Sequence, residues 1–134
     1  MFVQSQSDES RRLGGLIFEE SVTALDQFDV AWTASNTPGA LAVINSSGED
    51  SYGMIRRPEM PAALVEFGYL SNPPEAELFL TDEYRDVASV ALADAIELFL
   101  TTDEPGSGFV DEPRFFTPGG GTGGSGGCVD PELG

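Results

Sequence analysis

Residues 8–25 repeat apolar positions at helical spacing. They follow Ser7, a residue type that caps helices, and they open with two acids that suit the positive end of a helix. One face of this segment carries Leu13, Leu16, Ile17, Glu20, Ala24 and Leu25. The pattern predicts an amphipathic helix, in which Gly14 and Gly15 either cost up to ~1 kcal/mol each or let another backbone approach closely.

A second helical region begins after the turn sequence SNPP at residues 71–74. Asn72 can cap a short helix over residues 75–80, because the two prolines fit a first helical turn. Thr81 or Asp82 can cap a longer helix, whose apolar stripe is Tyr84, Val87, Ala88, Ala91, Ala95, Leu98 and Phe99. Such a stripe predicts packing against a sheet.

Short extended segments separate these helices. Residues 1–4 read as the end of a strand, and residues 26–53 contain two strand-like pieces, VAWTAS and GALAVINSSG, of which the second could equally begin as a helix. Residues 52–57 and 60–66 read as two adjacent strands, and the unbroken run AALV in the second is typical of a strand covered on both faces by helices. This mixture of helices and strands predicts an α/β fold.

The length of 134 residues and the 40% hydrophobic content suit one domain. We expect the folded domain over residues 1–104 and a flexible acidic and glycine-rich tail over 105–134, since the sequence from Thr117 onward is dominated by glycine. Within that tail, the aromatic cluster GFVDEPRFF can fold back on the domain. The glycine run beyond it is expected to be disordered.

The charge of the chain excludes two classes of partner. Twenty-three acids against six bases, all of them arginine, give a net charge of −17, which repels phosphate backbones and anionic lipid surfaces. We therefore expect no nucleic-acid partner. No apolar run approaches the ~18 residues that a membrane span needs, and the N-terminus lacks the pattern of a signal peptide, so no membrane insertion is expected.

Cys128 is the only cysteine of the chain. An intrachain disulfide and a cysteine-based metal cluster are therefore both impossible. Nothing near Cys128 in the sequence would lower the pKa of its thiol, so an incidental thiol is the expected reading.

Glu66 follows directly after the predicted strand AALV. In α/β sheets, ligands bind in the crevice at the carboxyl ends of the strands. Partial burial there can raise the pKa of a carboxylate, which can then act as a general base or as a metal ligand. The alternative is that Glu66 caps a neighbouring element or pairs with an arginine.

A longer phrase connects Glu66 with a known family. Residues 54–100, MIRRPEMPAALVEFGYLSNPPEAELFLTDEYRDVASVALADAIELFL, resemble the C-terminal part of the zinc-dependent N-acetylmuramoyl-L-alanine amidases known as amidase 3. The matching positions are Ile55, Arg56, residues 60–66, Gly68, Leu70, Ser71, Asn72 and Pro73. Tyr69 replaces the usual phenylalanine, and residues 2–25 match loosely.

The resemblance implies a structure and an activity. The fold would be the C-terminal half of a three-layer α/β/α arrangement with a mostly parallel sheet. Glu66 would be a catalytic glutamate beside zinc, in an enzyme that cleaves the amide between N-acetylmuramic acid and the L-alanine of the peptidoglycan stem peptide. Arg56 could orient or balance Glu66, with plain ion pairing as the alternative. The substrate would be peptidoglycan or a muropeptide, which implies an extracytoplasmic location.

One departure from the family pattern concerns the metal. The family binds zinc through two histidines and a glutamate, and this chain contains no histidine. The acids Glu9, Glu19, Glu20 and Glu49 lack imidazole partners, and oxygen ligands alone suit calcium or magnesium better than catalytic zinc. No metal ligand is therefore proposed within this chain.

Three explanations of the missing histidines stay open. The chain can be a fragment that lacks its metal-binding half, a degenerate homologue kept as a cell-wall or protein-binding module, or one part of a pair completed by a second polypeptide with the N-terminal half. The fragment is the preferred explanation, and a fragment should be inactive alone. An acidic soluble domain with no cell-wall role is a further alternative.

Overall fold

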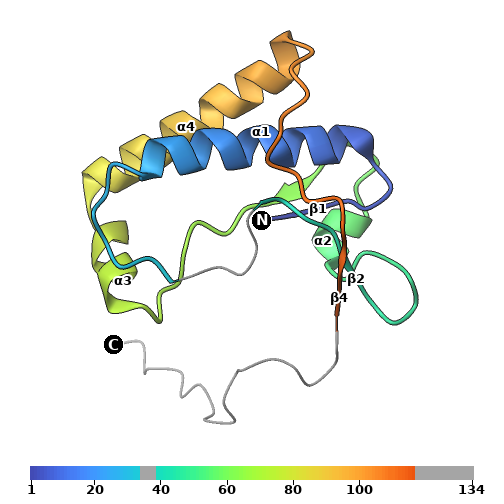
Figure 1. The fold of residues 1–134 in the computed structure, drawn as a ribbon, viewed down its shortest axis with the longest axis horizontal. Coiled ribbons are helices and arrows are strands. Elements are labelled where there is room, and N and C mark those ends of the chain that lie inside the picture. The colour runs from blue at the N-terminus through green and yellow to red at the C-terminus, as the bar shows by residue number, and fades with distance from the viewer. Residues whose placement is uncertain (34–38, 117–134) are drawn as a thin grey trace, which may run out of the picture.

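Two long helices lie against each other above a small sheet in the computed structural model, which describes residues 1–33 and 39–116 (Figure 1). They are α1 (Asp8–Leu25) and α4 (Asp82–Thr101), and both were predicted. Ser7 caps α1 by accepting a hydrogen bond from the Ser10 N–H at 3.1 Å. Of the two candidate caps of α4, Thr81 is the one used, since its hydroxyl accepts from the Tyr84 N–H at 3.2 Å.

The strands are short and come together from distant parts of the sequence. They are β1 (Phe2–Val3), β2 (Val43–Ile44), β3 (Ala63–Leu64) and β4 (Arg114–Phe115). β1 pairs antiparallel with β3, and β2 pairs parallel with β4. A parallel bridge between Phe2 and Leu41 joins the two pairs, because the Val3 N–H donates to the Leu41 carbonyl at 3.1 Å.

The arrangement of these strands is compatible with the predicted α/β class. The predicted parallel pairing is wrong for β3, the strand before Glu66, which runs antiparallel to its neighbour β1. Within the described residues, β2 and β4 form the only parallel pair of strands. The sequence could not show this, because a continuous apolar run fits a strand buried on both faces whatever the direction of its neighbour.

Two apolar clusters cover opposite faces of the sheet. On the side of the long helices, Leu16 and Ile17 of α1 meet Ala95 of α4, and Ala63 and Val65 pack against them. On the other side, Phe2, Leu41, Val43 and Ile55 form a cluster that Ala62 and Leu64 contact. Successive side chains of the AALV run therefore enter alternate clusters, as the two-unit period of a strand requires. The run was predicted to be covered on both faces by helices; the long helices cover one face, the other face meets the cluster around Phe2 and Ile55, and the four side chains are only half-buried.

The segment YGMIRR was predicted as a strand, and this prediction is wrong. It forms the single-turn helix α2 (Gly53–Arg56), in which the Tyr52 carbonyl accepts from the N–H groups of Ile55 and Arg56 at 3.0 Å. The turn buries Ile55 in the cluster under the sheet. In VAWTAS, residues 30–33 form no strand, and the remaining two residues lie outside the described part of the chain.

The two glycines of α1 allow close approach, which was one of the two predicted alternatives. A Cβ atom at Gly14 would overlap the Val3 side chain, and one at Gly15 would contact the backbone of Gly106, Gly108 and Phe109 at 3.5 Å. The strand β1 and the segment after α4 therefore lie directly against the same turn of α1.

The chain continues from β3 into the short helix α3 (Pro73–Phe79), which contacts α4. After α4, residues 105–116 fold back across α1 and enter the sheet as β4 (Figure 1). The aromatic part of the predicted tail thus packs on the domain. The rest of that tail, with Cys128, lies outside the described residues. Among the described helices, none combines the length and hydropathy that a membrane span needs.

Candidate active-site cleft

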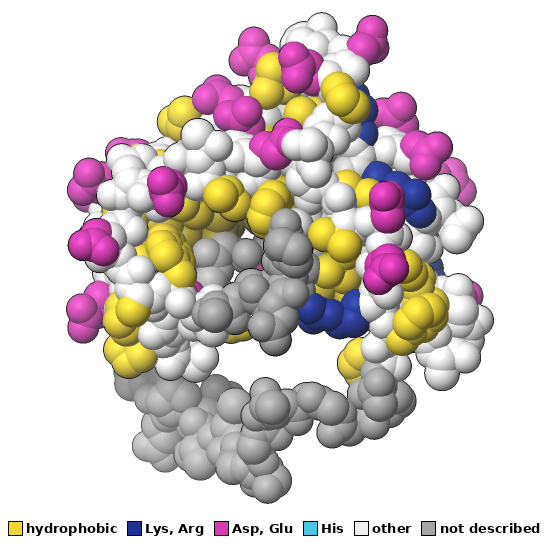
Figure 2. All heavy atoms as spheres, in the orientation of Figure 1, with side chains coloured by type: hydrophobic (Ala, Val, Ile, Leu, Met, Phe, Trp, Pro, Cys, Tyr) yellow, Lys and Arg dark blue, Asp and Glu magenta, His cyan; other side chains and the backbone are white. Residues whose placement is uncertain are grey.

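A cleft of about 780 Å³ lies between the second half of α1 and the chain that leaves β3. In the view of Figure 2, hydrophobic side chains gather beneath α1, while acidic side chains lie around the periphery. Aromatic side chains that line the cleft include Phe18, Trp32, Phe67 and Tyr69. Its charged side chains are Asp26, Glu66, Glu75 and Arg114.

Glu66 lies in the wall of this cleft, one residue beyond the AALV run. Its side chain is exposed, so the predicted partial burial is wrong. The cause is local: the strand ends at Leu64, and Glu66 belongs to an irregular segment that runs along the rim toward α3. Glu66 therefore lies exposed in the wall of the cleft, outside the core.

Arg56 does not lie in the cleft. Its guanidinium donates to the Glu49 carboxylate at 3.1 Å and to the Asp50 carbonyl at 3.4 Å, next to the turn before α2. Arg56 lines a different depression, on the side of the sheet where α2 lies. The structure thus gives Arg56 the plain ion pair that was the alternative to supporting Glu66.

Arg114 is one of the cleft residues that the sequence analysis missed. It begins β4, opposite Val43, and its N–H donates to the Ala42 carbonyl at 2.9 Å. Burial raises the pKa of the Tyr52 hydroxyl, the negative charge of Glu66 adds to this rise, and the positive charge of Arg114 opposes it. The charges of Glu66 and Arg114 therefore both act on the Tyr52 hydroxyl. In the sequence, the only sign of its place was that it lies in the aromatic cluster GFVDEPRFF, which was expected to fold back on the domain.

Glu75 closes the inner end of the cleft and is almost fully buried, with 1% of its surface exposed. Its carboxylate accepts hydrogen bonds from the Thr33 N–H, from the Tyr69 N–H at 2.6 Å and from the Asn72 side-chain amide at 2.8 Å. Burial alone would raise the pKa of Glu75, but these bonds stabilise the charged form and leave the pKa below its ordinary value.

The turn GYLSNP is folded around this buried carboxylate. Asn72 occupies the N-cap position of α3, as predicted, but its side chain makes no capping hydrogen bond. It donates instead to Glu75 and to the Ala31 carbonyl, the latter at 2.7 Å. Gly68 is required at its position, since a Cβ atom there would lie 2.6 Å from a Glu75 oxygen. Glu75 therefore fixes the path of the chain immediately after Glu66, although the two carboxylates have different surroundings.

The described residues do not fit a catalytic zinc ion. No group of three or more histidine, cysteine, aspartate or glutamate side chains suited to a metal is found among them, and the whole chain lacks histidine. The oxygens of Glu75 already accept N–H groups and amide hydrogens. Glu66 thus lacks the nitrogen or sulfur partners that a catalytic zinc site uses.

Comparison with known proteins identifies relatives with a common chemistry. AmiC of Neisseria meningitidis serogroup B, named an N-acetylmuramoyl-L-alanine amidase, is 27% identical over 96 residues, which are 70% of this chain and 19% of AmiC. LytH of Staphylococcus epidermidis, named a probable cell wall amidase, is 29% identical over 63 residues, or 47% of this chain and 22% of LytH. LytH of Staphylococcus aureus is 27% identical over 55 residues, or 41% of this chain and 19% of LytH.

The chain thus spans about a fifth of the length of these curated relatives. No solved structure matches it significantly. The family model described as N-acetylmuramoyl-L-alanine amidase matches residues 1–98, which include α1, the AALV run, Glu66, α3 and most of α4. The resemblance seen in the sequence is therefore confirmed, and this chain belongs to the amidase 3 family of N-acetylmuramoyl-L-alanine amidases.

Proposed function

We propose that this chain forms part of a peptidoglycan amidase, which hydrolyses the amide between N-acetylmuramic acid and the L-alanine of the stem peptide. The observation that carries the proposal is the position of Glu66 in the wall of the cleft, within the region matched by the amidase family. The names of the relatives AmiC and LytH support the same substrate.

Glu66 is suited to move protons in this reaction. Its carboxylate takes a proton from the attacking water as the water oxygen bonds to the amide carbon. It then gives that proton to the alanine nitrogen as the C–N bond breaks, so that the products are the lactyl acid and a free amine. Acid–base catalysis of this kind contributes about 10²- to 10⁴-fold to a rate. Exposure of Glu66 to the cleft leaves room for the water and the amide.

The cleft suits a glycopeptide in size and character. Its volume of about 780 Å³ falls within the ~300–1,000 Å³ usual for ligand pockets. The aromatic side chains of Phe18, Trp32, Phe67 and Tyr69 offer apolar faces to the sugar ring and the lactyl group. The polar ends of the substrate would meet Glu66 and Arg114.

The family is zinc-dependent, and the described residues do not fit a zinc ion. The proposal therefore gives this chain the roles of forming the cleft and supplying Glu66. It assigns the metal ligands to a complementing N-terminal half, with which this part would complete a three-layer α/β/α domain. Peptidoglycan lies outside the cytoplasmic membrane, so the site of action would be extracytoplasmic.

The absence of a metal cluster among the described residues favours one other candidate. In that candidate, the chain is a binding module derived from the amidase fold, and its cleft holds muropeptide without cleaving it. Glu66 would then contact the ligand but would have no role in hydrolysis.

A chimera can test the proposal. The segment of Neisseria AmiC that aligns with this chain over 96 residues is replaced by residues 1–98 of this chain. Hydrolysis of muramoyl-L-alanyl-D-isoglutamine is followed by mass spectrometry of the released peptide. We expect a folded, active chimera that loses at least about 10²-fold in rate with Glu66→Gln.

The matched control is Glu59→Gln, an exposed acid that precedes β3 and does not line the cleft. It should leave the rate unchanged. A chimera whose circular dichroism shows a folded protein, but which retains full activity with Glu66→Gln, would refute the catalytic role. If the chimera folds without activity while the full chain still binds the muropeptide, the binding module becomes the better assignment.

A further inference from the structure

Two segments without helix or strand contribute walls to the cleft. The first wall is residues 26–33, which follow α1 and carry Trp32, and the second wall is residues 65–69, which follow β3 and carry Tyr69. Both walls run toward α3 (Figure 1). In the first wall, the backbone–backbone hydrogen bonds between described residues join positions no more than four apart. Such local bonds do not tie this wall to the rest of the domain.

The carboxylate of Glu75 lies between the two walls and binds both. Its Oε1 accepts a hydrogen bond from the Thr33 N–H of the first wall, and its Oε2 accepts one from the Tyr69 N–H of the second wall at 2.6 Å. A Cβ atom at Gly68 would lie 2.6 Å from Oε2, so the second wall passes directly over the carboxylate. Because Glu75 is almost fully buried, water does not compete for these bonds. One carboxylate thus ties the two walls to each other.

Trp32, the only tryptophan of the chain, is held on both sides. On one side of it, the Thr33 N–H donates to Glu75. On the other side, the Ala31 carbonyl accepts from the Asn72 side-chain amide at 2.7 Å, and the same amide donates to Glu75 at 2.8 Å. The backbone that carries the indole ring is therefore fixed through Glu75 in both directions.

Apolar contacts anchor the beginnings of both walls without Glu75. In the first wall, the Phe28 ring packs on Tyr84 of α4, with the ring centres 5.7 Å apart. In the second wall, Val65 packs on the apolar cluster between the long helices. Loss of the Glu75 charge should therefore release the ends of the walls that carry the aromatic rings, while the domain stays folded.

We propose that Glu75 is a positioning residue of the cleft, which holds the Trp32 and Tyr69 side chains in the two walls before the ligand binds. This inference rests on the proposed function, in which that ligand is a muramoyl peptide. Glu75 acts through the two walls and not by touching the ligand, since its oxygens already accept hydrogen bonds from them. Side chains that are ordered before binding lose less conformational entropy when the ligand arrives, so such a link increases affinity.

Fluorescence of the full chain tests the inference without a ligand, because Trp32 is the only tryptophan. Emission and acrylamide quenching are measured at pH 7, and far-UV circular dichroism checks that each protein is folded. We expect Glu75→Gln to shift the emission to longer wavelength and to raise the quenching constant toward that of the urea-unfolded chain. Asn72→Ala, which releases Ala31 and keeps the acceptor of Thr33, should give a smaller change in the same direction. It provides the reading if Glu75→Gln is not folded.

Two controls separate positioning from a general loss of charge or stability. Glu77→Gln removes the same charge from an exposed position on α3 and should leave the Trp32 signal unchanged. Arg12→Ala removes hydrogen bonds at the end of α4, outside the cleft, and should destabilise the domain without changing that signal. An equal change in Arg12→Ala, or an unchanged signal in folded Glu75→Gln and Asn72→Ala, overturns the inference and leaves the proposed function standing.

Binding of muramoyl-L-alanyl-D-isoglutamine connects this link with the ligand. Isothermal titration calorimetry should show that Glu75→Gln binds the probe at least about tenfold more weakly than the wild type, because the ordering of two side chains then opposes binding. Glu77→Gln and Arg12→Ala should bind as the wild type does. Wild-type affinity in Glu75→Gln overturns the inference. If the wild type does not bind the probe, the proposed function is contradicted, and the fluorescence of the ligand-free variants still decides whether Glu75 positions Trp32.

Discussion

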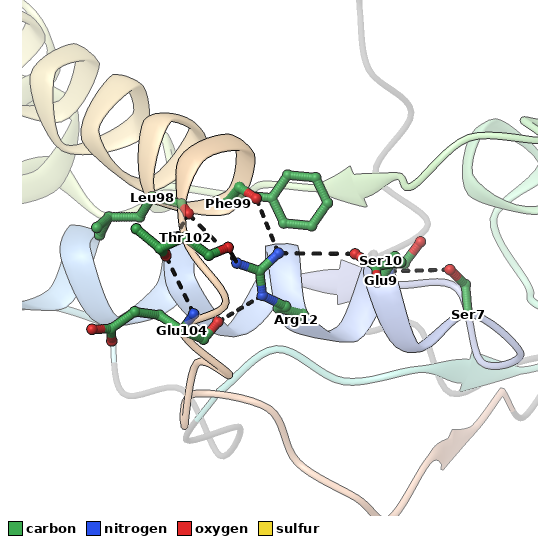
Figure 3. Close-up of polar contacts among 8 residues, drawn as sticks. All are labelled: Ser7, Glu9, Ser10, Arg12, Leu98, Phe99, Thr102 and Glu104. Atoms are coloured by element: carbon green, nitrogen blue, oxygen red, sulfur yellow. Dashed lines mark hydrogen bonds and ion pairs between the residues drawn. The ribbon is translucent and has the colours of Figure 1, made fainter.

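Arg12 of α1 closes the C-terminal end of α4 by lying over the ring of Phe99, with its guanidinium carbon 4.8 Å from the ring centre (Figure 3). The same guanidinium donates to the carbonyl of Phe99 at 3.0 Å, and to those of Thr102 and Glu104 at 2.6 Å each. The last turn of α4 contains no basic residue. A residue from the neighbouring helix thus supplies the positive charge that this helix end attracts.

Replacing Arg12 should loosen the contact between α1 and α4. We expect Arg12→Ala to lower the free energy of unfolding by about 2–3 kcal/mol, because several charge-assisted hydrogen bonds to carbonyl groups are lost. Arg12→Lys should lie between the wild type and the alanine variant, because lysine keeps the charge and lacks the planar fork. Urea denaturation followed by circular dichroism measures the difference.

The control for Arg12 is Arg57→Ala, which has the same change of charge at an exposed position. It should alter the free energy of unfolding by less than about 0.5 kcal/mol. An equal loss in both variants would mean that net charge, and not the end of α4, causes the effect.

Glu75 should make the stability of the domain depend on pH. Its pKa in the folded protein lies below the ordinary value of 4.5. A carboxyl group with a lowered folded pKa contributes stability that is present above the unfolded pKa and is lost as pH falls through the folded pKa. The unfolding free energy of the wild type should therefore fall below about pH 4.5, and the difference between the wild type and Glu75→Gln should shrink over the same range.

At pH 7, Glu75→Gln should be less stable than the wild type by about 1–3 kcal/mol, because an amide NH₂ then faces the donors of Thr33, Tyr69 and Asn72. Glu77→Gln is the matched control, since Glu77 is exposed on the same helix. Chemical denaturation from pH 3 to 8 for all three proteins provides the test. If the difference in unfolding free energy between the wild type and Glu75→Gln stays constant with pH, the role assigned to the buried carboxylate is contradicted.

The sequence indicated the two long helices well, for identifiable reasons. α1 and α4 have strong helical periodicity and good caps in Ser7 and Thr81, so their local preferences agree with the fold. The YGMIRR turn was misread because tertiary burial of Ile55 decided its conformation. The direction of β3 depends on which distant segments meet, which periodicity does not encode.

The cleft illustrates the same limit. Glu66 could be found because a family phrase surrounds it, whereas Arg114 comes from a segment outside that phrase. The buried role of Glu75 was not visible either, since an acid in the first turn of a helix is usually explained by the helix dipole. Its partners Thr33 and Tyr69 lie 42 and 6 residues away, and only the fold brings them to one carboxylate.

The two glycines of α1 should respond differently to the same substitution. Gly14→Ala places a methyl group where it overlaps Val3 of β1, so we expect a loss of about 1–3 kcal/mol in unfolding free energy. Gly15→Ala meets only ordinary contacts at 3.5 Å and gains helix propensity, so it should be neutral or more stable by up to about 1 kcal/mol. Thermal melts of the two variants make the comparison, and equal losses would disprove the close packing of β1 on Gly14.

Residues 105–116, which cross α1 and end in β4, should stabilise the domain. A chain that ends at Glu104 loses the backbone hydrogen bonds of residues 108–116 to residues 40–44 and the contacts of Ser107 and Phe109 with α1. It also exposes Ala40, Leu41 and Ala42, which are buried in the domain. Relative to a chain that ends at Phe116, we expect a loss of about 3 kcal/mol or more, since each lost hydrogen bond contributes about 1 kcal/mol.

Urea denaturation of the two truncated chains measures this difference, and the denaturant slope checks that both unfold as cooperative units. If the chain that ends at Glu104 is as stable as the longer one, residues 105–116 lie on the surface without contributing to the stability of the fold.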